Sequence, residues 1–558
     1  MRPRVLLVHA NPAVSASPVP PYGLERVARA FELAGCAVEL CCPFVEEDPV
    51  AVLAMALAPT PDLVGFGVRN LDDALVVCGT EGPSALDLTF YLDALRPLVA
   101  AAVAAVGRER VLVGGAALSA GARAILSALG LRWGVQGPAD DLCWRMGRAL
   151  VRYEAPFALE DTRLVDVETP AGAPVRLAHA WRQPPGPTPR HGGWLSIALA
   201  RGGRVPVQVA TGCDRGCWHC VEPCATGRVV ALRPVAEVVA EVEALARVGV
   251  RRLWLACSEL NVPDARHAAD LLRGLSGQGL DLRFYLQPDP VDDALLDALE
   301  GAGVDPAGLS FEFGHLAPEV LAAGGGPAPR AAIDRLVETW LRRGYRGLGA
   351  TVLFGAHPAE TEATLGAALA AARAIDAALP DGLGLALACG ARVYPGTPLA
   401  TRLSPDAPLY TADGGRPDPT FVAPVVHCRL GPPRALLRQI EAALAGMKGT
   451  VGPMNATAPG DLVAEALVTR GLMRLHEERF AAAVACFEVA LRRMPAHREA
   501  LAQLAQVRAN RLGDRAGAQE ALGRLLAALP AGDPGRPEVE AALEALGQQR
   551  QQVSGTNN

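Results

Sequence analysis

Short apolar runs alternate with amphipathic stretches over the first 150 residues of the chain. Helical patterns such as GLERVARAFELAG separate the apolar runs, which begin near Arg4, Ala37, Leu63, Arg110 and Arg132. Uninterrupted apolar strands between amphipathic helices are typical of a parallel sheet that is covered on both faces. The pattern therefore predicts a doubly wound, Rossmann-like α/β domain over residues 1–150.

The alternation is lost over residues 151–200, where the Pro/Gly-rich stretch RQPPGPTPRHGG predicts an interdomain linker. It returns over residues 201–400, where six strand patterns alternate with helices such as PRAAIDRLVETWLRRGY. Six βα units curl into a partial barrel, and barrels of this kind bind ligands at the carboxyl ends of their strands. We therefore expect a partial (β/α)6 barrel with its functional site at the strand ends.

A Pro-rich extension over residues 401–458 precedes a region, residues 459–546, that is almost wholly helical in pattern. Small, large and proline positions recur there about 35 residues apart, as in a tetratricopeptide (TPR) repeat. The first unit comprises Gly471, Ala483, Phe487, Ala490 and Pro495, and the second comprises Leu501, Ala505, Ala518, Leu522 and Pro530. These helices either bind a protein or peptide partner, or pack against the barrel and mediate self-association. The polar tail, residues 547–558, is expected to be disordered.

Charge and hydropathy exclude two classes of partner. The 558 residues carry 53 Lys and Arg against 59 Asp and Glu, a net charge of −6. This mixed surface has no basic footprint, so no nucleic-acid partner is expected. No apolar stretch reaches the roughly 18 residues of a membrane span, so no membrane partner is expected either. The short N-terminal apolar run ends at Asn11 and Pro12 without a cleavage site, which predicts a cytoplasmic protein with reduced thiols.

Three cysteines cluster in TGCDRGCWHC, directly after the first strand pattern of the second domain. Cys213, Cys217 and Cys220 stand at Cys-x3-Cys-x2-Cys spacing. Three thiolates suit a 4Fe–4S cluster in which one iron has no protein ligand. A structural zinc site is the rival interpretation, with His219 or Cys224 as its fourth ligand. However, no second pair of Cys or His follows at the spacing of a zinc finger.

The cysteine loop and the segments after it resemble the radical SAM superfamily, whose cluster cleaves S-adenosylmethionine (SAM) to a 5′-deoxyadenosyl radical. The resemblance covers residues 203–400. It rests on one motif at each of several successive strand ends, namely CSELN, FEFG, VLFGAHPAET and ARVYPGTPL. Each motif alone is weak, because a strand-end Glu or a Pro-Gly turn is common. Their order along the chain makes the resemblance specific.

The resemblance implies roles for individual residues. Glu259 of CSELN would contact the methionine amino group of SAM, and Glu312 of FEFG would meet its ribose or carboxylate. The turn that begins at Arg392 would orient the same cofactor. His219 stands where the family usually has an aromatic residue near the adenine. Ala359 replaces the second glycine of the family's Gly-x-Pro-Gly-Glu-Thr turn, which leaves a close backbone approach there open.

The first domain resembles the cobalamin-binding domain that precedes many radical SAM cores. The matching stretches are PVPPYGLERVARAFELAG, GFGVRNLDD, VLVGGAALS and VQGPAD. The resemblance implies that Arg69 and Asn70 lie at the lower face of the corrin, and that Gly114 and Gly115 let the backbone approach it. The Asp-x-His-x-x-Gly motif of a histidine lower ligand is absent, so we expect His9 to end a strand. A domain that has kept the fold without the ligand is the alternative.

Together these resemblances imply a cobalamin-dependent radical SAM methyltransferase that acts on an unactivated carbon. Its cofactors would be a 4Fe–4S cluster, SAM and cobalamin. Its partners would be a small-molecule or peptide substrate and an electron donor such as flavodoxin or ferredoxin. Three alternatives stay open: cyclisation or rearrangement without methyl transfer, loss of cobalamin, and a TPR-type adaptor with a degenerate core. The intact cysteine triplet argues against the adaptor, because a dead core has no use for oxygen-sensitive thiolates.

Overall fold

The N-terminal domain is built on a six-stranded sheet. The computed structural model describes the chain apart from residues 1, 13–18, 47, 73–75, 77–85, 87, 89, 170–194, 196–202, 307–308, 325, 454–461, 477, 531 and 555–558. The strand order is β2-β1-β3-β4-β5-β6. The strands are β1 (Arg4–His9), β2 (Ala37–Cys41), β3 (Leu63–Gly67), β4 (Val111–Gly114), β5 (Trp133–Val135) and β6 (Leu164–Asp166). The first five pair in parallel and β6 pairs antiparallel to β5.

One part of the predicted linker is wrong. β6 falls inside residues 151–200 and completes the N-terminal sheet, so this domain continues past residue 150. The strand is only three residues long, and its partly exposed side chains give no clear apolar signal in the sequence. The stretch RQPPGPTPRHGG lies outside the described residues.

Helices cover both faces of this sheet, because successive side chains of a strand point to opposite sides. Val5 and Leu7 of β1 belong to one apolar core, with α1 (Tyr22–Ala34) and α5 (Asp140–Val151). Leu6 and Val8 belong to the other core, which is closed by α2 (Pro49–Ala56), α3 (Leu92–Val106) and α4 (Ala122–Leu129). The prediction of a doubly wound α/β domain is confirmed.

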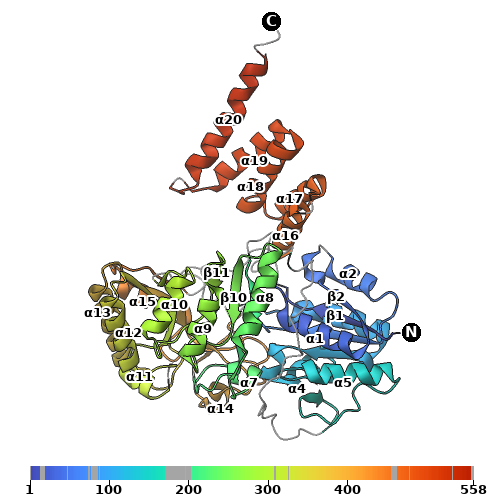
Figure 1. The fold of residues 1–558 in the computed structure, drawn as a ribbon, viewed down its shortest axis with the longest axis horizontal. Coiled ribbons are helices and arrows are strands. Elements are labelled where there is room, and N and C mark those ends of the chain that lie inside the picture. The colour runs from blue at the N-terminus through green and yellow to red at the C-terminus, as the bar shows by residue number, and fades with distance from the viewer. Residues whose placement is uncertain are drawn as a thin grey trace.

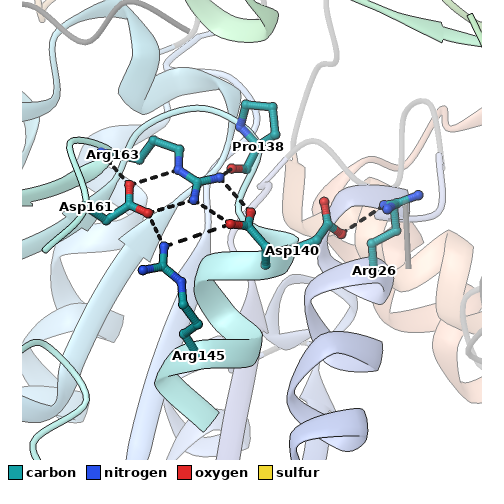
Figure 2. Close-up of polar contacts among 7 residues, drawn as sticks. Arg26, Pro138, Asp140, Arg145, Asp161 and Arg163 are labelled. Atoms are coloured by element: carbon teal, nitrogen blue, oxygen red, sulfur yellow. Dashed lines mark hydrogen bonds and ion pairs between the residues drawn. The ribbon is translucent and has the colours of Figure 1, made fainter. Parts of the chain in front are cut away.

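Arginine–aspartate pairs fix α5 at the carboxyl edge of the sheet (Figure 2). Arg26 on α1 donates to Asp140, the first residue of α5, at 3.0 Å, and both side chains are buried. Arg163, just before β6, pairs with Asp141 and with Asp161 at 2.7 Å each. The turn between β5 and α5, which contains the stretch VQGPAD, is therefore held from both sides.

The second domain is a partial barrel of six parallel strands, each followed by helix. Its strands are β7 (Val205–Gln208), β10 (Arg252–Ala256), β11 (Asp281–Arg283), β12 (Ser310–Gly314), β13 (Gly347–Phe354) and β14 (Gly382–Cys389). β7, β10 and β11 form one sheet and β12 to β14 another, and a parallel bridge between Leu286 and Phe311 joins them. The covering helices are α8 (Val235–Arg247), α9 (Ala265–Leu275), α10 (Asp293–Gly301), α12 (Arg330–Arg342) and α13 (Glu362–Ala378). The predicted barrel is confirmed.

The Pro-rich extension completes the barrel. α15 (Pro433–Leu444) packs on its outside, and β18 (Val451–Pro453) pairs with β14 at its edge. β16 (Leu409–Tyr410) and β17 (Val426–His427) form a small antiparallel sheet with β15 (Ala391–Arg392). Within the barrel strands, buried residues that face the helices alternate with partly exposed ones such as Trp254 and Glu312. The partly exposed set therefore lines the inside of the barrel.

The C-terminal helices form an arm that projects from the α/β body (Figure 1). They are α16 (Leu462–His476), α17 (Phe480–Arg493), α18 (Arg498–Val507), α19 (Arg515–Ala528) and α20 (Arg536–Ser554). A Cβ at Gly471 would lie 2.4 Å from the Phe487 ring, so these two repeat positions let α16 and α17 approach closely. The assignment to the TPR class stays a prediction.

The arm is anchored on the N-terminal domain. Arg470 pairs with Glu46 at 2.8 Å, and Met473 packs against Val45. α20 continues to Ser554, so the sequence was wrong to expect disorder from residue 547, where Gln and Arg in fact extend a helix. No helix in the described ranges combines the length and apolarity needed to cross a membrane.

Candidate functional site

The cysteine loop lies at the carboxyl end of β7. It is closed at its base by an antiparallel hairpin, β8 (Ala210–Thr211) with β9 (Ala231–Leu232). Gly212 has a φ of 84°, and a Cβ there would lie 2.1 Å from the Val229 carbonyl oxygen. The hairpin therefore requires glycine at this position. α7 (Glu222–Thr226) follows the third cysteine and ends the loop.

The three thiols lie in a desolvated environment. Cys213 is buried, and Cys217 and Cys220 are partly buried. Burial raises the pKa of all three thiols, to about 11 for Cys217 and about 12 for Cys220. They are protonated at neutral pH unless a cationic centre binds and favours the thiolates.

The loop offers three cysteine thiols as metal donors. Among the described residues, no three His, Cys, Asp or Glu side chains converge on one point that could hold a single metal ion. A 4Fe–4S cluster distributes three thiolates over three different irons. Cys213, Cys217 and Cys220 could hold such a cluster.

A cavity of about 160 Å³ adjoins the loop on its outer side. Cys217 and Cys220 line it together with Cys224, Arg228 and Arg402. The Cys224 thiol faces the Gly396 carbonyl oxygen at 3.6 Å rather than the other thiols. This contact ties α7 to the turn after β15.

The CSELN turn after β10 borders the cysteine loop. The Ser258 hydroxyl donates to the Gly212 carbonyl oxygen at 3.4 Å. Burial raises the pKa of Glu259, while the side chain of Gln287 and the charge of Arg215 act in the opposite direction. Glu259 in turn contributes to the raised pKa values of Cys213 and Cys217. The turn therefore places a carboxyl group near the thiols, and its role as a SAM contact stays a prediction.

Asn261 holds this turn in place. Its side chain is fully buried, donates to the carbonyl oxygens of Gln287 and Pro290 at 2.9 and 2.7 Å, and accepts from the Gln287 amide at 3.0 Å. The Oε1 atom of Gln287 is buried and has no donor in the described part of the chain. A polar ligand beside Glu259 would satisfy this oxygen.

Glu312 points into the barrel from β12. Burial raises its pKa to about 7, the charge of Glu259 adds to the effect, and a hydrogen bond with Thr351 opposes it. Tyr285, from the segment after β11, is 44% exposed and stacks edge-to-face on Trp254 at 5.0 Å between centroids. Burial raises the pKa of Tyr285 and the nearby charge of Glu312 adds to the effect, so the two groups face the same space. That space could accept a polar ligand or substrate.

The turn after β13 is built around Glu360. This buried carboxylate accepts from the backbone amides of Gly355 at 2.6 Å and His357 at 2.8 Å. Ala359 does not have a positive φ, so the backbone there does not require the glycine that the family pattern has. The His357 ring packs edge-on against Trp218 of the cysteine loop, with 5.4 Å between the ring centroids. Burial and the nearby His357 lower the pKa of His219 to about 4, so its ring is neutral at pH 7.

The carboxyl edge of the N-terminal sheet, where the sequence predicts the corrin, offers few reactive side chains among the described residues. Its strand order reverses between β1 and β3, and open α/β sheets bind ligands at such a switch point. Arg69 and Asn70 follow β3 there and are exposed. Gly115 has a φ of 107°, and a Cβ would lie 2.2 Å from the Val68 carbonyl oxygen, whereas at Gly114 the nearest atom is 3.9 Å away. The fold therefore requires glycine at position 115, whereas the space beside Gly114 is open.

Two observations bring the edges of both domains together. α7 of the cysteine loop contacts the 3-10 helix Ala116–Ala120, which follows β4 and Gly115. Burial lowers the pKa of His9, and the charge of Arg69 adds to this effect. Burial raises the pKa values of Glu222 and Tyr285, which belong to the barrel, and the charge of Arg69 opposes that rise. His9 ends β1 in a buried position, as expected.

Arg392 lies at the contact with the N-terminal domain. Its guanidinium Nε donates to Asp72 of that domain at 2.8 Å. Its other nitrogens donate to carbonyl oxygens of residues 393, 421 and 422. Asp72 is 320 residues away in the chain, so this pairing left no local signal in the sequence. The role of the Arg392 turn toward SAM stays a prediction.

Sequence reasoning missed the supporting residues of the site. Asn261, Glu360 and Asp72 stand inside motifs that the sequence singles out. Asn261 and Asp72 act by contacts with another turn, and Glu360 acts by accepting backbone amides of its own turn. Gln287 and Tyr285 lie in the strand pattern DLRFYLQP and looked like ordinary strand residues. Only the closure of the barrel brings them beside Glu259 and Glu312.

Comparisons with known proteins agree with this geometry. The Radical SAM superfamily profile matches residues 207–370. A tryptophan 2-C-methyltransferase of Streptomyces laurentii is 28% identical over 421 residues, which is 64% of this chain and 68% of that protein. A ribosomal protein uS12 methylthiotransferase RimO of Kineococcus radiotolerans is 36% identical over 177 residues, only 35% of its own length.

Two solved structures share the fold over most of the chain. The radical SAM methyltransferase TsrM of Kitasatospora setae, with cobalamin and a [4Fe-4S] cluster bound, has a TM-score of 0.62 at 23% identity. It matches 86% of this chain and 100% of its own. The cobalamin-dependent SAM radical enzyme OxsB, with aqua-cobalamin and SAM bound, has a TM-score of 0.59 at 11% identity and covers 98% and 84%.

Proposed function

We propose that this chain, which carries a radical SAM domain, is a cobalamin-dependent methyltransferase that modifies an unactivated carbon. The proposal rests on the contact between the carboxyl edges of the two domains, where ligands would bind. There, α7 of the cysteine loop lies against the turn after β4. A substrate between these edges would be within reach of groups bound to either domain. The names of the similar methyltransferases support the same reading.

We assign the cluster to Cys213, Cys217 and Cys220, and the SAM contacts to the barrel turns. When bound, the cluster supplies the electron that cleaves SAM, and cobalamin supplies the methyl group. Glu259 would accept from the methionine amino group, and the buried Oε1 of Gln287 offers a second acceptor beside it. Asn261 ties the two residues together, because it belongs to the Glu259 turn and its side chain bonds the backbone of Gln287.

Glu312 would act as the polar group nearest the centre of the barrel. With a pKa raised to about 7 by burial, it is partly protonated at neutral pH and can donate or accept a hydrogen bond there. Tyr285 and Thr351 flank it. These groups suit the ribose hydroxyls of SAM or a polar part of the substrate, which we take to be a small molecule or a peptide.

The N-terminal domain, β1 to β6, would bind the corrin at its carboxyl edge. Arg69 and Asn70 offer an exposed polar surface beneath it, and a guanidinium does not coordinate cobalt. Gly114 leaves the space above β4 open for a large flat ligand. We assign the helices α16 to α20 to a TPR-like arm that binds a protein or peptide partner. We assign the whole enzyme to the cytoplasm, where its thiols stay reduced.

An acidic electron carrier such as flavodoxin or ferredoxin would dock over the outer cavity. Arg228 and Arg402 are exposed at its rim, and Val229 beside them is 46% exposed. The Arg402 guanidinium lies 5.6 Å from the centre of the Trp218 ring within the cysteine loop. Arg228→Ala/Arg402→Ala should slow cluster reduction by flavodoxin and leave reduction by dithionite unchanged. Equal loss with both reductants would contradict this assignment.

The proposed function is tested by metal and product analysis after anaerobic reconstitution with iron, sulfide and hydroxocobalamin. We expect about four irons and one cobalt per chain, and release of 5′-deoxyadenosine and S-adenosylhomocysteine from SAM. The Cys213→Ala/Cys217→Ala/Cys220→Ala variant should lose iron and 5′-deoxyadenosine but keep cobalt. Iron without cobalt would sink the cobalamin part of the proposal, and zinc in place of iron would sink the radical SAM part.

A further inference from the structure

A buried ion pair joins the N-terminal domain to the barrel. Arg392 donates from Nε to Oδ2 of Asp72 at 2.8 Å, and the two side chains are 3% and 0% exposed. The Tyr394 hydroxyl lies 3.2 Å from Oδ1 of the same carboxylate. Both oxygens of Asp72 are thus bonded to residues of the ARVYPGTPL motif. The VRNLD turn of one domain and the ARVYPGTPL turn of the other therefore form one contact.

Each nitrogen of the Arg392 guanidinium has a hydrogen-bond acceptor at this interface. Beyond Asp72 it donates to the carbonyl oxygens of Phe421 at 3.1 Å and Val422 at 2.8 Å, and also to that of Val393. Val422 itself belongs to the apolar core of the N-terminal domain. A charge pair with satisfied hydrogen bonds is tolerated in such a place, whereas either charge alone is not.

The ion pair lies close in the chain to a residue that acts electrostatically on the barrel. Asp72 follows Arg69 by three residues, and a bridge between Asp72 and Phe90 holds the turn on its other side. The charge of Arg69 acts on Glu222 and Tyr285 of the barrel. On the barrel side, Pro395 of the same motif packs where a Cβ of Gly121 would lie, 2.8 Å away. Any shift of the ARVYPGTPL turn would therefore move the VRNLD turn with it.

We propose that Asp72 and Arg392 are positioning residues that lock the corrin-facing turn, residues 68–72, onto the barrel and so set the distance between the two cofactor sites. The locking rests on contacts within this chain. The setting of a cofactor distance rests on the proposed function. The two parts can fail separately, and each has its own measurement.

The lock is tested on the full-length protein without cofactors by hydrogen–deuterium exchange. Asp72→Asn removes the carboxylate that faces the buried Arg392 cation, and Arg392→Gln removes the guanidinium that faces the buried Asp72 carboxylate. We expect each to speed exchange of peptides covering residues 68–72 and 391–394 by a factor on the order of 100. The double variant, with neither charge, should exchange more slowly than either single variant. Unchanged exchange in the single variants, or additive effects in the double, would overturn the proposal.

A matched control lies within the barrel. Arg233 and Glu241 form an ion pair of 2.7 Å whose side chains are 4% and 2% exposed. Glu241→Gln removes a pair of the same chemistry and burial that does not cross the domain interface. It should loosen α8 and leave exchange of residues 68–72 at the wild-type rate. If it speeds exchange there equally, the effect of Asp72→Asn is general destabilisation and the proposal fails.

The positioning role is tested by cobalt EPR after reconstitution with iron, sulfide and hydroxocobalamin. In the wild type, the reduced cluster should enhance the relaxation of the Co(II) signal, and this enhancement should fall several-fold in Asp72→Asn with cobalt content retained. Unchanged relaxation despite faster exchange would overturn the positioning role and leave a purely structural contact. If the wild type retains no cobalt, the proposed function fails, while hydrogen exchange still decides whether the lock exists.

Discussion

The two edges that meet in this molecule are built in opposite ways. The barrel edge carries its chemistry in side chains: three thiols, Glu259 and Glu312, several with pKa values raised by burial. The N-terminal edge offers mainly backbone and shape, with Gly115 in a left-handed conformation and exposed Arg69 and Asn70. A side-chain site is destroyed by removing functional atoms, and a shape site by adding them. The following variants use this difference, in order of expected effect.

The largest effect is expected at the barrel edge, in Cys217→Ala compared with Cys224→Ala. Both thiols line the same cavity, but Cys224 faces the Gly396 carbonyl oxygen. Removal of Cys217 should reduce reconstituted iron from about four per chain to background, because the cluster would be left with two protein ligands. Cys224→Ala should retain iron and its visible absorption. Equal iron loss in both variants would make Cys224 a ligand and reopen the zinc interpretation.

At the N-terminal edge, adding one methyl group should impair ligand binding, as removing a sulfur atom should in the barrel. Gly115→Ala places a Cβ 2.2 Å from the Val68 carbonyl oxygen at a φ of 107°. The local strain should cost about 2–3 kcal/mol, seen as lost exchange protection of β3 and β4, and hydroxocobalamin affinity should fall more than tenfold. Gly114→Ala, with 3.9 Å of clearance, is the matched control and should keep exchange protection. Comparable loss of protection in both variants would contradict the assignment.

A smaller effect is expected from the buried carboxyl group of the barrel. Because the folded pKa of Glu312 is raised from 4.5 to about 7, the folded state holds its proton more tightly than the unfolded state. Stability should therefore fall as pH rises from about 4.5 to about 7, by about 2 kcal/mol after allowance for partial exposure. Glu312→Gln should remove this slope in urea unfolding followed by tryptophan fluorescence. The exposed Glu338→Gln should keep it, and parallel curves for Glu312→Gln and wild type would refute the account.

The smallest effect is expected at the position that departs from the family pattern. Ala359 does not have a positive φ, so glycine would relieve no backbone strain there. It would only raise the conformational entropy of the unfolded chain. Ala359→Gly should lower the stability of the barrel by roughly 0.5–1 kcal/mol and leave SAM affinity unchanged. Urea unfolding and a SAM-binding titration check both statements. Tighter SAM binding in Ala359→Gly would show that the alanine obstructs a close backbone approach.

Most of the architecture could be predicted from the chain because periodicity is local. The six barrel strands and the parallel strands of the first domain follow from apolar runs between amphipathic helices. β6 escaped because three residues at a sheet edge give too short a pattern, and the helix after residue 546 escaped because its polar residues resemble a disordered tail. Both errors occur where a segment takes its structure from a neighbour rather than from its own pattern.

The candidate site divides in the same way. The sequence by itself determined the cysteine triplet and the order of the strand-end motifs, since these are spacings within a few residues. Only the tertiary structure decided that Arg392 pairs with Asp72. It also decided that the Val68 carbonyl oxygen leaves no room for a side chain at residue 115, and that burial raises the pKa of Glu312 to about 7. Each of these depends on a contact between segments far apart in the chain or on exclusion of water. Burial and long-range pairing are properties of the packed molecule, and no local spacing encodes them.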